Sequence, residues 1–438
     1  VRARAMAFHD RNWLSKKEIL SRGITEQHVA SYRLNQYRKS FAVKTWVPLL
    51  GDITFRTISL DLSFEEACAL KSACSRYNSM QLERRRRATA DNKDGDDGGT
   101  HDARKLFLES KVLVSLAERI DKVISEGKFG QKAFMAKLDT RSPKDALTYN
   151  SNVIRYRRLV EGEFDCISSL YFLLSSFSKT MEEAMTREIT LGFIRAQNKA
   201  LKLRSGSDLV QLFIRSFRIQ EDLGTCMWYG EEHFEAQIVL REWDEWACAH
   251  PEAEFRCFVH KGHLTAATQY FSSCYFPELH ARRVETAEKI ACFFEKKVKE
   301  KLADTYDSYV IDFLVDMGSA WNKAARSTTD AKKKCAQERT EESIRVIELN
   351  TYESYTGSGL FSWRQDRQLL MQGPYELRVV EKPTRVKVED VVAKKWVPFV
   401  ENYVRNRKNL ALQQSLMFLI AGATLFLKFV YSVPHHPS

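Results

Sequence analysis

Short segments with the pattern of β-strands alternate along this chain with longer segments that have the pattern of amphipathic helices. The strand pattern occurs at 54–60, 238–243, 254–259, 264–270, 309–315 and 345–349. The helix pattern occurs at 106–124, 182–195, 208–222 and 284–302. Because the strand segments follow one another as hairpins rather than in regular βαβ units, the pattern predicts an α+β fold.

Two local signatures give the ends of predicted elements. Ser63 is followed three positions later by Glu66, a spacing typical of a capping box at the start of a helix. Lys261-Gly262 lies between two strand segments, which indicates a hairpin turn. His260 and His263 flank this turn, but no cysteine pair lies nearby, so a zinc site is disfavoured.

Two stretches lose the apolar periodicity. The first, 84–105, begins with the arginine run Arg84–Arg87 and continues into a segment rich in Asp, Asn and Gly. The second, 318–343, contains three consecutive lysines, 332–334. We expect both to be flexible surface insertions. The arginine run could contact phosphates, but we interpret it as the solvated end of a helix.

An apolar run extends from 415 to 433 with a single charged residue, Lys428. About 20 apolar residues are enough for a helix to cross a bilayer. Because Arg405, Arg407 and Lys408 precede the run, the positive-inside rule keeps the rest of the chain on the cytoplasmic side. We therefore expect a C-terminal tail anchor over 405–438. The alternatives are a buried C-terminal helix and a soluble cytoplasmic protein.

Composition narrows the classes of function. Hydrophobic residues make up 44% of the 438 positions, which excludes a wholly disordered chain. The nine cysteines are dispersed without C-x-x-C spacing, and this favours a reducing compartment. The net charge of +11 favours an anionic partner. Much of the basic excess lies in the arginine run, the lysine run and the 405–408 flank, so direct nucleic-acid binding is not favoured.

Oxygen-bearing side chains interrupt two apolar strand segments. Asp312 lies inside 309–315, and Glu348 and Asn350 lie on one face of the following strand, two positions apart. A carboxylate in an apolar strand is costly unless it is paired or liganded. Two carboxylates and an amide oxygen on neighbouring strands would suit Mg²⁺. The alternative interpretation is ordinary alternation, with these side chains facing solvent.

Candidate cations occur in three other segments. Lys137 ends a strand-like segment just before the turn Ser142-Pro143-Lys144-Asp145, and Arg241 and Arg256 lie in strand segments. Arginine forks and lysines bind phosphate well. Trp243 could stack on a base or fill the core. The sequence has no Walker A motif, no dinucleotide-binding glycine motif, no nucleophile elbow and no zincin motif, and we assign no catalytic residue.

Several ordered blocks together resemble the cell division cycle protein 123 family. The blocks are 137–146, 204–208, 219–223, 240–243, 254–259, 268–270, 309–312 and 346–350. Each block is short, and their shared order between Trp46 and Trp363 is what makes the resemblance specific.

The resemblance implies a bilobal ATP-grasp-like fold with a nucleotide between the lobes. We place this fold over 44–404, between a basic extension at 1–43 and the tail at 405–438. The family's best-known members bind ATP and Mg²⁺ and help to assemble eukaryotic translation initiation factor 2 through its gamma subunit. By this resemblance the nucleotide contacts are Lys137, Arg241, Trp243 and Arg256, and the Mg²⁺ ligands are Asp312, Glu348 and Asn350.

This chain departs from the family pattern in several places. Glu348 stands where the family usually has aspartate, and Thr351 stands where a proline often follows the asparagine. The insertion at 318–343 lengthens the connection between the two segments that bear the carboxylates. The apolar tail is also absent from the best-known members.

Three functions remain open at this point. The first is an ATP–Mg²⁺-binding assembly chaperone, with or without turnover, that acts as a monomer on the initiation factor. The second is an ATP-dependent ligase of the ATP-grasp type, which would activate a carboxylate or a nucleic-acid end. The third is a membrane-tethered scaffold with a degenerate pocket.

Overall fold

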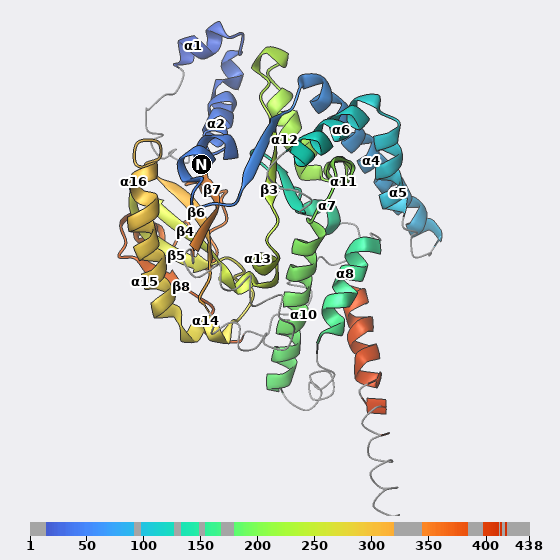
Figure 1. Cartoon of the computed structure of the whole chain (residues 1–438), viewed down its shortest axis with the longest axis vertical. Helices are drawn as coiled ribbons and strands as arrows, with labels where there is room; N and C mark the ends of the chain where they lie inside the picture. The colour runs from blue at the N-terminus through green and yellow to red at the C-terminus, as the bar shows by residue number, and fades with distance from the viewer. Residues whose placement is uncertain are drawn as a thin grey trace, which may run out of the picture.

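The computed structural model describes residues 15–91, 98–126, 133–148, 154–167, 179–318, 344–383, 397–410, 412, 413 and 417. Two β-sheets and numerous helices make up the described part (Figure 1), which confirms the predicted α+β class. The predicted insertion at 318–343 and the apolar run at 415–433 lie outside the described residues, apart from Gly318 and Met417. Among the residues that are described, no helix has the length and apolar character needed to cross a membrane.

The smaller sheet has three antiparallel strands in the order β1-β3-β2. One face buries apolar side chains such as Leu138, Ile238 and Leu240 against a helical layer. The other face, which carries Lys137 and Arg241, is directed at the larger sheet. The strands are β1 (Thr57–Asp61), β2 (Phe134–Leu138) and β3 (Gln237–Glu242), and the layer comprises α4 (Phe64–Asp91), α5 (Gly98–Leu108), α6 (Lys111–Glu126), α11 (Gly206–Ile214) and α12 (Phe217–Met227).

The larger sheet has five strands in the order β7-β6-β4-β5-β8, antiparallel except for the pair β5-β8. Its strands are β4 (Glu254–His260), β5 (His263–Gln269), β6 (Tyr309–Val315), β7 (Ile344–Thr351) and β8 (Glu376–Arg378). One face packs on a long helical segment (Figure 1) made of α15 (Arg283–Phe293), the π-helical turn Phe294–Val298 and α16 (Lys299–Leu302). The opposite face packs partly on α19 (Arg367–Gln372) and carries the polar positions described below.

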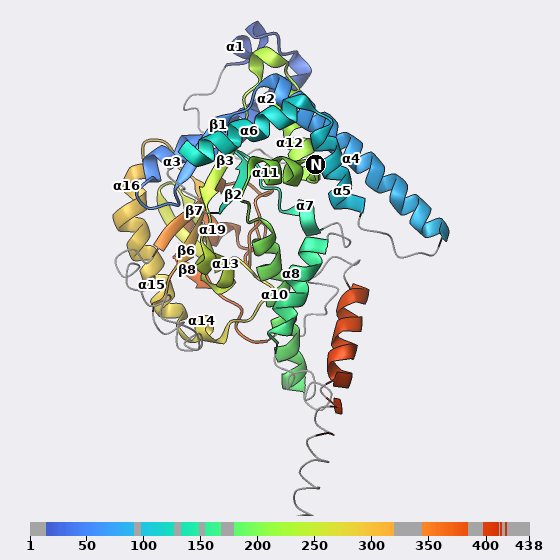
Figure 2. The same ribbon diagram turned by 45° about the vertical axis from the view of Figure 1, so that its right-hand side comes forward.

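The remaining helices surround the two sheets. A helix over 397–410 lies beside α8, which spans Ile154–Asp165 (Figure 2). The ring of Phe164 in α8 stacks on the ring of Phe399 in this helix. The other elements are α1 (Lys16–Ser21), the 3₁₀ turn Glu26–His28, α2 (Val29–Lys39), α3 (Val43–Leu50), α7 (Asp145–Thr148), α8 (Ile154–Asp165), α10 (Lys179–Ala200), the 3₁₀ turn Glu231–His233, α13 (Glu245–Ala249), the 3₁₀ turn Pro251–Ala253 and α14 (Pro277–Ala281).

Two local predictions are confirmed. Ser63 and Glu66 form the reciprocal capping box at the start of α4, with the Glu66 amide 3.1 Å from Ser63 Oγ and the Ser63 amide 2.8 Å from Glu66 Oε2. Lys261 and Gly262 form the turn between β4 and β5, and both have a positive φ. Turns of this kind match the twist of the strands that they connect.

The prediction of a flexible insertion over 84–105 needs correction. Helix α4 continues to Asp91, and α5 begins at Gly98 (Figure 2). An Arg84 guanidinium nitrogen lies 2.9 Å from Oδ1 of the buried Asp102, and Ala103 is fully buried against the core. Tertiary contacts therefore stabilise helices in a stretch whose polar composition predicts none.

Gly206 is required by the close approach of α11 to α6. A Cβ atom at this position would lie 2.1 Å from the backbone oxygen of Ala117. Because the obstacle is backbone in a buried helix, it cannot rotate away as a flexible side chain would. Gly162 in α8 offers the opposite case, since a Cβ there would meet nothing within 4 Å.

We predict that Gly206→Ala lowers the free energy of unfolding by about 2–3 kcal/mol, because the added methyl group forces two packed helices apart. Gly162→Ala is the matched control and should raise it by up to about 1 kcal/mol, because alanine favours a helix more than glycine does. Urea denaturation followed by circular dichroism measures both. Equal stability of the two variants would contradict this account of the packing.

Candidate functional site

Three charged residues stand side by side across the larger sheet. Arg256 of β4 pairs in register with Asp312 of β6, and Asp312 pairs with Glu348 of β7. We call these three residues the charged row. They lie on the sheet face opposite the α15–α16 segment, because their sequence neighbours Phe255, Cys257 and other apolar residues fill the core beneath that segment.

Arg256 binds Asp312 through both arms of its guanidinium. Nε and Nη2 each lie 2.8 Å from one carboxylate oxygen, and Nη1 donates to the Gly357 carbonyl at 2.9 Å. Burial opposes the positive charge of Arg256, but the paired carboxylate outweighs burial and raises the pKa of the guanidinium. The pair is therefore charged, geometrically fixed and almost fully desolvated.

Lys137 reaches the charged row from the smaller sheet. Its Nζ forms an ion pair with Glu348, so β2 and β7 are connected across the space between the sheets. Burial opposes ionisation of Glu348, but Lys137, with help from Lys144 and Arg256, outweighs burial and lowers the pKa of Glu348 to about 2. Glu348 is therefore ionised at every physiological pH.

A second lysine and a second glutamate lie beside the charged row. Lys144, in the turn after β2, donates from Nζ to the Tyr270 hydroxyl at 3.3 Å. Tyr270, Glu254 and Glu348 together raise the pKa of Lys144. Burial raises the pKa of Glu254 to about 7, and Lys144 only partly offsets that effect. Two glutamates on one sheet face thus have pKa values on opposite sides of the ordinary range.

Arg241 lies between the two sheets, where groups of the protein hold its guanidinium. Its guanidinium lies in the interior between the sheets, with Nη1 bonded to the Ile347 carbonyl, Nη2 2.7 Å from Thr54 Oγ1 and Nε 3.3 Å from Thr57 Oγ1. The register of β6 and β7 shifts next to Asp312, and the shift leaves the Ile347 carbonyl available to Arg241. Burial lowers the pKa of Arg241 to about 10.

Trp243 does not reach the charged row. It follows the last residue of β3, where the alternation of side chains ends, and it packs against the core of the smaller sheet. The nearest cation over its ring is Lys202, 5.8 Å from the centroid. The structure thus brings together Lys137, Arg256, Asp312, Glu348 and Asn350, places Arg241 beneath them and leaves Trp243 elsewhere.

The oxygen cluster expected to hold Mg²⁺ contains two carboxylates and one amide. The side-chain amide nitrogen of Asn350, Nδ2, lies 3.5 Å from Asp312 Oδ2. Among the described residues, no group of three or more His, Cys, Asp and Glu side chains is placed to hold a metal. Mg²⁺ commonly binds one or two carboxylates together with phosphate oxygens and water, so this donor set fits Mg²⁺ that arrives with a phosphorylated ligand.

Sequence reasoning missed Lys144 and Tyr270 as members of the site. Lys144 also has its charge above the Tyr270 ring, 5.2 Å from the centroid, and Arg256 lies 5.0 Å from the same centroid. The available signal was the turn Ser142-Pro143-Lys144-Asp145, in which only Lys144 carries a positive charge. Nothing in the periodicity shows that this turn faces the end of β5.

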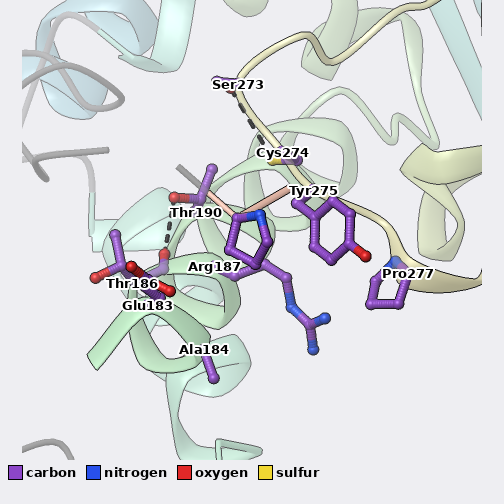
Figure 3. A pocket seen from close by; sticks show the side chains of 10 residues that line it. Glu183, Ala184, Thr186, Arg187, Thr190, Ser273, Cys274, Tyr275 and Pro277 are labelled. Carbon is purple, nitrogen blue, oxygen red and sulfur yellow. Dashed lines mark hydrogen bonds between the residues drawn. The ribbon is translucent and has the colours of Figure 1, made fainter. Parts of the chain in front are cut away.

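A cavity of about 210 Å³ lies away from the charged row (Figure 3). It opens between the first half of α10, which supplies Glu183, Arg187 and Thr190, and the loop that carries Cys274 and Tyr275. Arg187 forms an ion pair with Glu188 at 2.7 Å, and burial raises the pKa of the Cys274 thiol to about 11. The cavity therefore offers neither an unpaired cation nor a reactive thiol, and we place the candidate site at the charged row.

Residues 192–399 match the model of the D123 family. The match covers slightly less than half of the chain, and over that part the chain is similar to the D123 family. Six members of the site fall within the matched residues: Glu254, Arg256, Tyr270, Asp312, Glu348 and Asn350. Lys137, Lys144 and the helices α1 to α8 lie before them.

Two similar relatives are proteins of Xenopus laevis and Xenopus tropicalis, each described as a translation initiation factor eIF2 assembly protein. The first is 25% identical over 185 residues, which are 41% of this chain and 46% of the relative. The second is 25% identical over 179 residues, which are 40% of this chain and 45% of the relative. The chain thus matches about half the length of each relative.

Among solved structures, Cdc123 from Schizosaccharomyces pombe aligns with 79% of this chain and 98% of its own, at 16% identity and a TM-score of 0.44. A C-terminally truncated form of the same protein aligns with 80% of this chain and 98% of its own, at 15% identity and a TM-score of 0.46.

We predict that Glu254→Gln makes stability less dependent on pH. A carboxyl whose pKa rises from about 4.5 to about 7 on folding contributes stability below pH 4.5, and this contribution is lost as the pH rises through 7. The variant avoids that loss. If the two proteins have the same free energy of unfolding near pH 4, that of the variant should exceed that of the wild type by at most about 3 kcal/mol at pH 8.

Urea denaturation at several pH values measures the difference, with Glu288→Gln on the exposed face of α15 as the matched control. The control should follow the wild type throughout. If Glu254→Gln also follows the wild type between pH 4 and 8, then Glu254 is not the buried acid described above.

Proposed function

We propose that this chain is an assembly chaperone for translation initiation factor eIF2 and that it binds ATP with Mg²⁺ at the charged row. The nucleotide part of the proposal rests on one observation: three cations gather around two carboxylates of the larger sheet, Asp312 and Glu348. The cations are Arg256 of the same sheet, Lys137 of the smaller sheet and Lys144 of the turn after β2. The assembly role is supported by the match to the D123 family model and by the description of the Xenopus relatives.

Lys137 and Arg256 each already have a carboxylate partner that the phosphates of a nucleotide could replace. Phosphate oxygens would replace Asp312 as the partner of Arg256 and Glu348 as the partner of Lys137. The freed carboxylates and the Asn350 amide oxygen would then hold Mg²⁺. The metal supplies neutralisation of phosphate charge, and the protein's part is to orient the phosphates between the two lysines and Arg256.

In this proposal the two sheets are the two lobes of an ATP-grasp-like fold, with the nucleotide between them. Supporting contacts are the Lys137–Glu348 ion pair and the bond from Arg241 to Ile347, both of which connect β2 or β3 with β7. Glu348 has one methylene more than the family's aspartate, and this length lets it meet Lys137 across the gap. A nucleotide would thereby fix the mutual orientation of the sheets that a partner protein contacts.

We predict that ATP with Mg²⁺ stabilises the wild type and fails to stabilise Asp312→Asn or Lys144→Met. At a ligand concentration of 100 times Kd the free energy of unfolding should rise by about 2.7 kcal/mol. Thermal unfolding with and without ATP–Mg²⁺ measures the effect, and Lys111→Met, an exposed lysine at the start of α6, is the matched control.

The wild type and Lys111→Met should respond alike. No stabilisation of the wild type by ATP–Mg²⁺ would exclude the nucleotide site. Analysis of the nucleotide after incubation separates a chaperone that retains ATP from a ligase, because a ligase releases ADP or AMP once an acceptor carboxylate or nucleic-acid end is present.

We predict that the full chain captures the gamma subunit of eIF2 in a pull-down with purified subunits. ATP–Mg²⁺ should increase the yield, because it orders the two sheets, and chelation of Mg²⁺ should reduce it. Asp312→Asn should capture less gamma subunit than Lys111→Met at equal protein concentration. If a folded wild type with bound nucleotide retains no gamma subunit, this partner is excluded.

A further inference from the structure

The helices α1 and α2 form an arm that lies outside the 192–399 family match. The arm stands at the apex of the molecule (Figure 1) and buries Ile19 and Tyr32 in a small core of its own. One side of the arm is attached to the segment after α12: the Tyr32 and Tyr229 rings meet edge to face at 4.9 Å, and the His233 ring donates to the Arg22 carbonyl at 2.7 Å.

The other end of α2 contacts the loop that follows β7. The Arg38 guanidinium lies 4.8 Å from the centroid of the Tyr355 ring, a typical cation–π distance. The preceding residue, Tyr37, accepts a hydrogen bond from the backbone of Tyr352, and burial, with Glu353 nearby, raises the pKa of its phenol. Two consecutive residues of α2 thus hold the loop 352–360.

The same loop contacts the charged row. The Gly357 carbonyl accepts the bond from Arg256 Nη1 at 2.9 Å, and a Cβ at Gly357 would lie 3.1 Å from that nitrogen. Gly359, with a φ of +61°, approaches Thr268, the in-register neighbour of Arg256. The Leu360 amide donates to Thr268 Oγ1 at 3.3 Å. A shift of the loop would therefore move the partner of Arg256.

The end of α2 also faces the smaller sheet. Arg38 is close enough to act on the charge of Asp222, which accepts a hydrogen bond from Thr140 just beyond β2. Lys39 is buried beside Glu235 and acts on Asp139. Helix α2 thus contacts the loop after β7 and lies within electrostatic reach of the segment after β2, and these two segments follow the strands that Lys137 and Glu348 connect.

We propose that the α1–α2 arm is a strap that holds the loop 352–360 against the charged row and so slows the release of a phosphorylated ligand bound there. The contact between arm and loop stands on the geometry above, and its effect on ligand release rests on the proposed function. Arg38 acts through Tyr355 and Gly357, so it positions Arg256 and is not itself a ligand-binding group.

Hydrogen exchange measured by mass spectrometry on the full chain tests the contact without any ligand. Arg38→Ala and Tyr355→Ala should each speed exchange of amides in 352–360 about two- to fivefold, because each removes the cation–π contact. The double variant should add little to either single one. Lys17→Ala, an exposed lysine of the same arm, is the matched control and should leave the loop unchanged.

Stopped-flow release of a fluorescent ATP analogue, bound with Mg²⁺, tests the consequence. Arg38→Ala and Tyr355→Ala should release it about two- to fivefold faster than the wild type and Lys17→Ala, and Arg38→Lys, which keeps the charge and loses the planar stacking, should fall between. Unchanged loop exchange in both alanine variants would overturn the strap. Faster loop exchange without faster release would overturn its effect on the ligand.

If the wild type binds no nucleotide, the proposed function fails by that result alone. The contact between arm and loop is then decided by the exchange data, which need no ligand. Should Arg38→Ala fail to fold, Arg38→Lys tests the same side of the contact and Tyr355→Ala tests the other side.

Discussion

The buried guanidinium of Arg241 is the contact on which the arrangement of the site depends. It extends from the smaller sheet to the Ile347 carbonyl of the larger one, and its other nitrogens bond Thr54 and Thr57. A cation removed from water is costly unless polar groups surround it, and here neutral oxygens and the rings of Phe55 and Trp46 do so. Ile347 immediately precedes Glu348, so the same bond fixes the backbone that directs Glu348 toward Lys137.

With the sheets held in this way, the charged row neutralises itself. Arg256 and Lys137 are positioned by the carboxylates that they bind, and those carboxylates are positioned in turn. In the proposed complex, anionic oxygens of the ligand would replace the carboxylates as partners of Arg256 and Lys137, and a divalent cation would replace Arg256 and Lys137 as the partner of the carboxylates. An anion alone would leave the carboxylates without a partner, and a cation alone would leave Arg256 and Lys137 without one. The opposite pKa shifts of Glu348 and Glu254 show how strongly a few ångströms decide which carboxyl stays ionised in this small region.

Local sequence patterns predict many of the elements and several residues of the site. The features that they miss depend on contacts between segments that are not adjacent in the sequence. Strand alternation placed Glu348 and Asn350 on one face of their strand, and the capping box at Ser63 and the turn at Lys261 are local patterns that the structure confirms. The family resemblance placed Arg241 and Trp243 together among the nucleotide contacts, but β3 ends at Glu242, and Trp243 packs against the core of the smaller sheet. Helices α4 and α5 continue into a polar stretch because of the Arg84–Asp102 ion pair, which connects residues far apart in sequence. Lys144 belongs to the site through the same kind of contact, with Tyr270 of a different sheet.

The division of the site between the two parts of the chain explains why similarity alone does not define its function. The carboxylates, Arg256 and the loop 352–360 lie within the family match, whereas the two lysines and the arm precede it. Without Lys137, Glu348 would be a half-buried carboxylate facing only more distant cations. Without the arm, the loop that binds Arg256 would lose the contacts of Tyr37 and Arg38. The matched part therefore supplies the anions and the sheet that aligns them. The part before it supplies Lys137, which neutralises Glu348, and the arm that contacts the loop 352–360.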